Sequence, residues 1–82
     1  MTKKMLEAIE TLEMRMDLAV YLYTHKVSSK YEAMEQIDKL KRDFNELRMQ
    51  CYRFGFITRN EFKETMNVAE EMSIKYKDKL LK

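Results

Sequence analysis

Apolar residues recur at alternating steps of four and three along three long stretches of the chain. The series are Met5, Ile9, Leu12, Met16, Ala19 and Tyr23; Ala33, Ile37, Leu40, Phe44, Leu47, Cys51 and Phe54; and Phe62, Met66, Ala69, Ser73, Tyr76 and Leu80. Only Ser73 is polar among them. This spacing is typical of helices that pack nearly parallel to one another through a heptad seam.

Two short breaks separate the three stretches. Ser29 closes the first break and is followed three residues later by Glu32, which is the arrangement of a capping box. The second break contains Gly55, which suits the left-handed position just after a helix, and Thr58 with Glu61 repeats the capping box. We therefore predict helices over residues 3–25, 30–54 and 59–80.

The predicted fold is an all-α, antiparallel (up-down-up) three-helix bundle with heptad-type, coiled-coil-like packing, forming one domain over residues 1–82. Glycine occurs once and proline never, so few turns are expected. Short connections between helices of similar length favour this topology. The alternative is a long helical hairpin that completes its core only as a dimer.

Composition narrows the classes of function. Sixteen basic and fourteen acidic residues give a net charge of +2, too balanced to indicate DNA binding. The longest apolar run, Leu18–Tyr23, is too short to span a membrane, and no signal peptide is apparent, so we expect no membrane partner. A single cysteine excludes an internal disulfide and fits a reducing compartment. Together these features favour a cytoplasmic protein.

Residues suited to catalysis or metal binding are sparse. His25, the only histidine, falls at a predicted helix end, where capping is its expected role. Cys51 falls on the apolar seam and is expected to pack there. No glutamate has a histidine three residues later, and one glycine cannot form a phosphate-binding loop. We therefore expect no enzymatic activity, cofactor or metal.

The first predicted helix carries a second apolar line opposite its seam. Met14, Leu18 and Tyr21 form this line at steps of four and three, with Leu22 beside it and His25 continuing it. A helix that is apolar on two faces is either buried all round or has a second partner. Both interpretations, a wider core and a protein interface, stay open at this point.

The leading functional hypothesis is a non-enzymatic protein–protein interaction module, acting as a regulator, adaptor or inhibitor. It would dock through the first helix onto another protein or a second copy of itself. The methionine- and lysine-rich, proline-free composition resembles that of many accessory proteins of low-GC bacteria and their phages.

Two alternatives belong to other classes of function. One is a nucleic-acid-binding regulator that uses the arginines around the second break, beside aromatic residues that could stack on bases. These arginines are Arg42, Arg48, Arg53 and Arg59. The other alternative is a structural bundle that only associates with itself.

Overall fold

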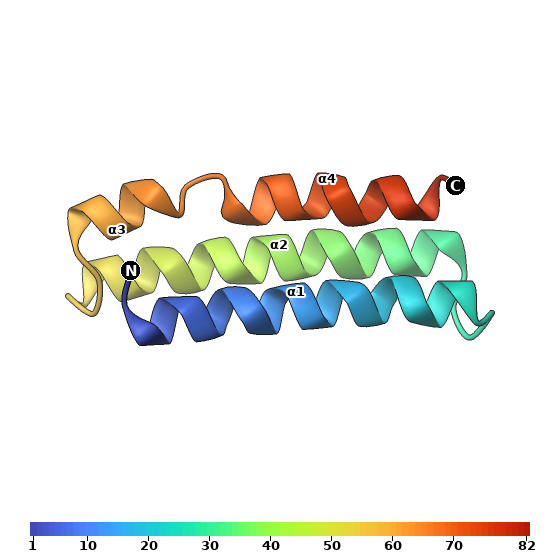
Figure 1. Cartoon of the computed structure of the whole chain (residues 1–82), viewed down its shortest axis with the longest axis horizontal. Helices are drawn as coiled ribbons and strands as arrows, with labels where there is room; N and C mark the ends of the chain where they lie inside the picture. The colour runs from blue at the N-terminus through green and yellow to red at the C-terminus, as the bar shows by residue number, and fades with distance from the viewer.

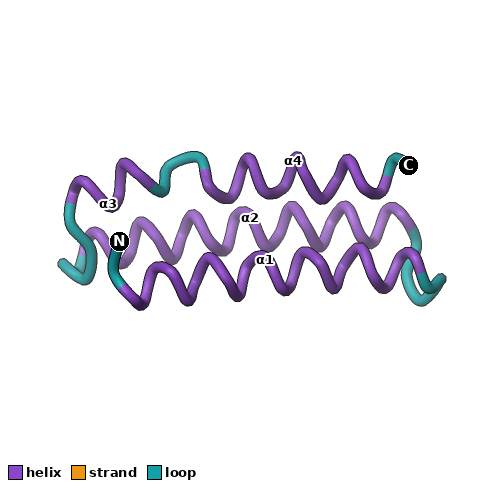
Figure 2. The backbone as a smooth tube through the Cα atoms, in the orientation of Figure 1, coloured by secondary structure: helices purple, strands orange, loops and turns teal.

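The molecule measures 42 × 16 × 16 Å along its three principal axes. Three helical rods run side by side along its long axis (Figure 1). The computed structural model describes all 82 residues and contains no strand (Figure 2). Its helices are α1 (Lys3–Thr24), α2 (Lys30–Arg53), α3 (Arg59–Glu64) and α4 (Val68–Leu80). The third rod consists of α3 followed by α4, and α4 contacts both α1 and α2. The predicted all-α three-helix bundle is therefore confirmed, and one chain closes its own core.

The two turns between the rods share one backbone design. After α1, Lys26 has a φ of 61°, and the Val27 N–H donates to the Leu22 carbonyl at 2.8 Å. After α2, Gly55 has a φ of 79°, and the Phe56 N–H donates to the Cys51 carbonyl at 2.8 Å. Both are Schellman motifs, which satisfy carbonyls that a helix end leaves without partners. The left-handed Gly55 was predicted from the sequence, whereas the left-handed lysine was not.

The predicted capping boxes differ in how completely they form. At the start of α2, the Glu32 N–H donates to Ser29 Oγ at 3.1 Å, and the Ser29 N–H donates to Glu32 Oε1 at 3.2 Å. At the start of α3, the Glu61 N–H donates to Thr58 Oγ1 at 3.1 Å. The Glu61 carboxylate, however, accepts from the Thr2 hydroxyl on α1's N-cap instead of returning to Thr58. The reciprocal half of the second box was therefore predicted wrongly.

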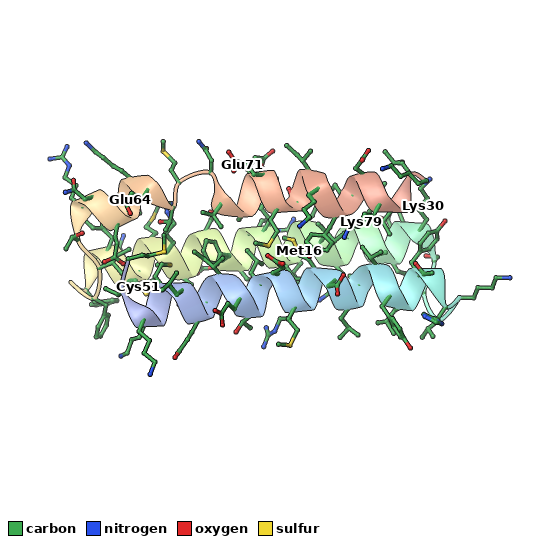
Figure 3. All side chains as sticks on the ribbon, in the orientation of Figure 1. Met16, Lys30, Cys51, Glu64, Glu71 and Lys79 are labelled. Atoms are coloured by element: carbon green, nitrogen blue, oxygen red, sulfur yellow. The ribbon has the colours of Figure 1, made fainter.

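The core follows the predicted seams over most of their length. Its buried apolar members are Met5, Leu12, Met16, Ala19, Ala33, Ile37, Leu40, Phe44, Ile57, Ala69, Tyr76 and Leu80. Met16 lies near the middle of the bundle, between the ribbons (Figure 3). Three predicted seam residues, Leu47, Phe54 and Met66, are instead exposed. All three lie in the half of the molecule that contains α3.

The third predicted helix is interrupted, so the prediction of one helix over 59–80 was wrong. α3 ends at Glu64, Thr65 caps it, and α4 begins at Val68. The interruption turns Thr65 into the interior and leaves Met66 exposed. The buried Arg48 of α2 donates hydrogen bonds to this interruption.

Phe44 provides a direct test of the core. Phe44→Ala removes a large buried ring from the middle of α2 and is expected to lower the free energy of unfolding by about 3–5 kcal/mol. Denaturant unfolding followed by circular dichroism measures the loss. Leu47→Ala, a half-exposed neighbour, should lose less than about 1.5 kcal/mol. Equal losses for the two variants would contradict this assignment of the core.

The two left-handed residues predict substitution effects of opposite sign. Lys26→Gly should raise the free energy of unfolding by about 1 kcal/mol, because a side chain is strained at positive φ. Gly55→Ala should lower it by about the same amount, although nothing lies within 4 Å of the added Cβ. Thermal denaturation measures both effects. A Lys26→Gly variant that melts below wild type would show that lysine makes a compensating contact.

Candidate interaction surfaces

The second apolar line of α1 lies on the outside of the bundle. Met14, Leu18 and Tyr21 are 71%, 53% and 56% exposed. The opposite face of the same helix supplies Met5, Leu12, Met16 and Ala19 to the core. The interpretation that a wider core covers the second line is therefore wrong. We call Met14, Leu18, Tyr21, Leu22 and His25 the α1 stripe.

The remaining members of the stripe fix its borders. The rings of Tyr21 and His25 lie 4.0 Å apart between centroids and are tilted by 36°, so His25 extends the stripe to the end of α1. Leu22 is partly buried and, with Leu18, lines a shallow groove between α1 and α2. Glu32 and Gln36 contribute the α2 side of that groove. The stripe therefore has an apolar centre and a polar border towards α2.

The four arginines proposed for nucleic-acid contact do not form one surface. Arg42 lines a polar hollow along α2 together with Glu35 and Asp38. Arg48 is only 6% exposed, so its proposal as a nucleic-acid contact was wrong. Arg53 and Arg59 remain exposed and flank the turn between α2 and α3. Arg42 is exposed as well, so Arg48 is the one arginine of the four that is buried.

Arg48 joins α2 to the end of α3. Its Nε donates to Thr65 Oγ1 at 2.9 Å and to the Phe62 carbonyl at 3.1 Å, and Nη2 donates to the same carbonyl. The guanidinium also lies 4.0 Å from the centre of the Phe62 ring, which stacks on Tyr52 at 4.5 Å. Desolvation lowers the pKa of Arg48 from its usual value. Arg48 has no carboxylate partner, so carbonyl, hydroxyl and ring satisfy the charge.

Glu61 joins α3 to the start of α1. Its buried carboxylate accepts from the Thr2 hydroxyl at 3.0 Å, while Thr2 Oγ1 accepts from the Met5 N–H at 3.3 Å. The first turn of α1 contains no acidic residue of its own. Glu61 thus supplies, from another helix, the negative charge that a helix N-terminus favours. We interpret both Arg48 and Glu61 as structural side chains.

Residues with reactive side chains are dispersed. Cys51 is partly buried in an apolar hollow with Leu47 and Ile57. Burial, Glu13 and Asp17 raise the pKa of the Tyr76 hydroxyl, which therefore stays protonated at neutral pH. No group of three or more histidine, cysteine or acidic side chains is placed to hold a metal ion.

No protein-family model, curated protein or solved structure matches this chain. None of its helices combines the length and apolar character needed to cross a membrane.

The contact between Arg48 and α3 is testable by a double-mutant cycle. Arg48→Met keeps the bulk of the side chain but removes the guanidinium donor to the Thr65 hydroxyl and to the Phe62 carbonyl, which then keeps only the Thr65 hydroxyl at 3.2 Å. The free energy of unfolding should therefore fall by about 2–3 kcal/mol. Combining it with Thr65→Val should reveal a coupling of about 1 kcal/mol. Arg42→Met, on the exposed side of α2, should change stability by less than about 0.5 kcal/mol. A neutral Arg48→Met variant would mean that packing alone holds α3.

Proposed function

We propose that this chain is a non-enzymatic protein-interaction module that docks through the α1 stripe onto another protein chain. The observation that carries the proposal is the exposure of Met14, Leu18 and Tyr21 on a helix whose opposite face already fills the core. These side chains follow one another at steps of four and three on a face that the core does not use, and large exposed apolar patches on monomers usually mark interaction sites. A regulator, adaptor or inhibitor of another protein is the class of function that fits.

The surroundings of the stripe resemble the anatomy of a protein interface. Arg15 borders it on the side of α2, and Glu10 and Asp17 border it on the side of α4. An apolar centre inside a charged rim is the usual organisation of such contacts, because the rim stays hydrated while the centre is desolvated. The border on the side of α4 is acidic, whereas the border on the side of α2 carries both Arg15 and Glu32, and this asymmetry would give the partner a defined orientation.

The types of side chain also support a contact surface. Met14 can adapt its shape to a partner, because its side chain is flexible and its sulfur is polarisable. Tyr21 offers a large contact area with few rotatable bonds, and its ring already packs against His25. An interface of standard size buries about 800 Å² on each partner, so the stripe would be its centre and the rim would complete it.

Substitution of the stripe should separate binding from folding. Leu18→Glu with Tyr21→Lys is expected to leave the helical signal and melting temperature near wild type, because both side chains face water. The same charges would be buried without partners in a complex, so association should weaken by at least about a hundredfold. Affinity capture from the native host and sedimentation of the isolated protein measure binding to other chains and to itself.

A matched control lies elsewhere on the bundle. Met66→Glu with Ile74→Lys replaces apolar side chains of similar exposure outside the α1 stripe, and this variant should bind like wild type. Two results would overturn the proposal. Unfolding of the Leu18/Tyr21 variant would place the stripe in the core, and unchanged association would place the interface elsewhere.

A further inference from the structure

The turn between α2 and α3 exposes two phenylalanines at one end of the rod. Phe54 and Phe56 are 70% and 62% exposed, and they bracket the left-handed Gly55. The turn projects at the end of the bundle where the N-terminus also lies (Figures 1 and 2). We call Phe54, Gly55 and Phe56, with the cations around them, the aromatic tip.

The backbone of this turn does not depend on phenylalanine. The turn after α1 has the same hydrogen-bonding pattern, with His25 in the place of Phe54 and Val27 in the place of Phe56. An equivalent turn therefore forms in this chain without phenylalanine at either position. An apolar residue at the position of Phe56 often contacts the preceding helix turn in this motif, and Phe56 lines an apolar hollow with Cys51. Phe54 has no such role, so its exposed ring is surplus to the turn.

Exposed cations lie on the segments that adjoin the two rings. Lys3, Lys4, Arg53 and Arg59 are exposed, and none of them forms an ion pair with a carboxylate. Lys4 Nζ lies 5.3 Å from the centre of the Phe56 ring. The neighbouring acids are fewer: Glu7 and Glu64 are exposed, whereas Glu61 is buried and accepts from Thr2. The tip therefore combines two exposed apolar rings with an excess of exposed cations on the segments that adjoin them.

We propose that the aromatic tip docks on the surface of a lipid bilayer that contains anionic lipids. Phe54 and Phe56 enter the boundary between headgroups and acyl chains, and the flanking cations contact the lipid phosphates. This docking is peripheral and needs no membrane-spanning segment. The sequence-based expectation of no membrane partner rested on the absence of such a segment, and that absence does not bear on a docking tip.

The shape of the tip favours a bilayer over a nucleic acid. Single-stranded nucleic acids bind in basic grooves whose aromatic faces stack on successive bases. Here Tyr52 already stacks on Phe62, and Lys4 lies over the Phe56 ring, which leaves Phe54 as the free aromatic face. A projecting turn with two apolar side chains instead suits a bilayer, because its apolar interior lies directly beneath negatively charged headgroups.

Tryptophan fluorescence tests insertion directly. The chain contains no tryptophan, so Phe54→Trp reports on the tip without background. Its emission should shift to shorter wavelength with phosphatidylcholine vesicles containing about one third phosphatidylserine, and should not shift with phosphatidylcholine alone. Val27→Trp, at the equivalent turn on the other end of the rod, should not shift with either vesicle. An unshifted Phe54→Trp with anionic vesicles, or an equal shift for Val27→Trp, overturns the proposal.

Vesicle co-sedimentation tests the separate contributions of the rings and the cations. Phe54→Ser with Phe56→Ser should reduce binding to the anionic vesicles by at least about tenfold without loss of helical signal, while Val27→Ser binds like wild type. Arg53→Gln with Arg59→Gln should weaken binding at low salt, as raised salt should for wild type. Undiminished binding by the Phe54/Phe56 variant would show that the tip is not the docking site.

Two comparisons distinguish bilayer docking from protein docking through the α1 stripe and from nucleic-acid binding. Leu18→Glu with Tyr21→Lys should bind vesicles like wild type, because the α1 stripe lies outside the tip. Fluorescence anisotropy with a labelled single-stranded oligonucleotide provides the second comparison. Binding of the oligonucleotide that depends on Phe54 and Phe56, without binding of vesicles, would assign the tip to nucleic acid and overturn the bilayer proposal.

Discussion

Burial of Arg48 on α2 is the constraint on which the third rod depends, because a buried charge must find hydrogen-bond partners. In a continuous helix the Phe62 carbonyl would accept from the Met66 N–H, four residues later. In this chain the Met66 N–H donates to Lys63 instead, and the freed Phe62 carbonyl accepts from Arg48. The last carbonyls of a helix have no donor within the helix, so they can accept from the guanidinium. The interruption provides acceptors for the buried arginine, and the arginine satisfies a carbonyl that the interruption leaves without its helical donor.

This local exchange also organises the end of the bundle that bears the aromatic tip. With the helix stopped, Thr65 points inwards and completes the arginine's hydrogen bonds, and Met66 is left in solvent. α3 is short and contacts mainly α2, so it depends on two polar contacts, one at Arg48 and one between Glu61 and Thr2. The exposed turn that precedes α3 is consequently anchored to both α1 and α2.

The sequence predicted the rods and both turns because apolar spacing, capping residues and glycine are local signals. It missed the interruption because Thr65, Met66 and Asn67 include neither glycine nor proline. A step of three from Phe44 leads to Leu47, and a step of four leads to Arg48. The apolar pattern predicts that the leucine is the buried one, and only the packed structure shows that the arginine is buried instead. The α1 stripe was visible as a pattern, yet periodicity does not tell how much of a helix its neighbours cover. Its exposure therefore required the three-dimensional structure.

The two proposed contact regions occupy different parts of an elongated molecule. The α1 stripe runs from Met14 to His25, towards the turn between α1 and α2, whereas the aromatic tip lies at the opposite end of a rod 42 Å long. A bilayer engaged by the tip would meet the end of the rod and leave the outer face of α1 accessible from the side. Occupation of one region therefore does not block the other, and a protein bound along α1 could be held beside a membrane by the same chain. The stiffness needed for such an arrangement comes from the packed core and from the polar contacts that fix α3.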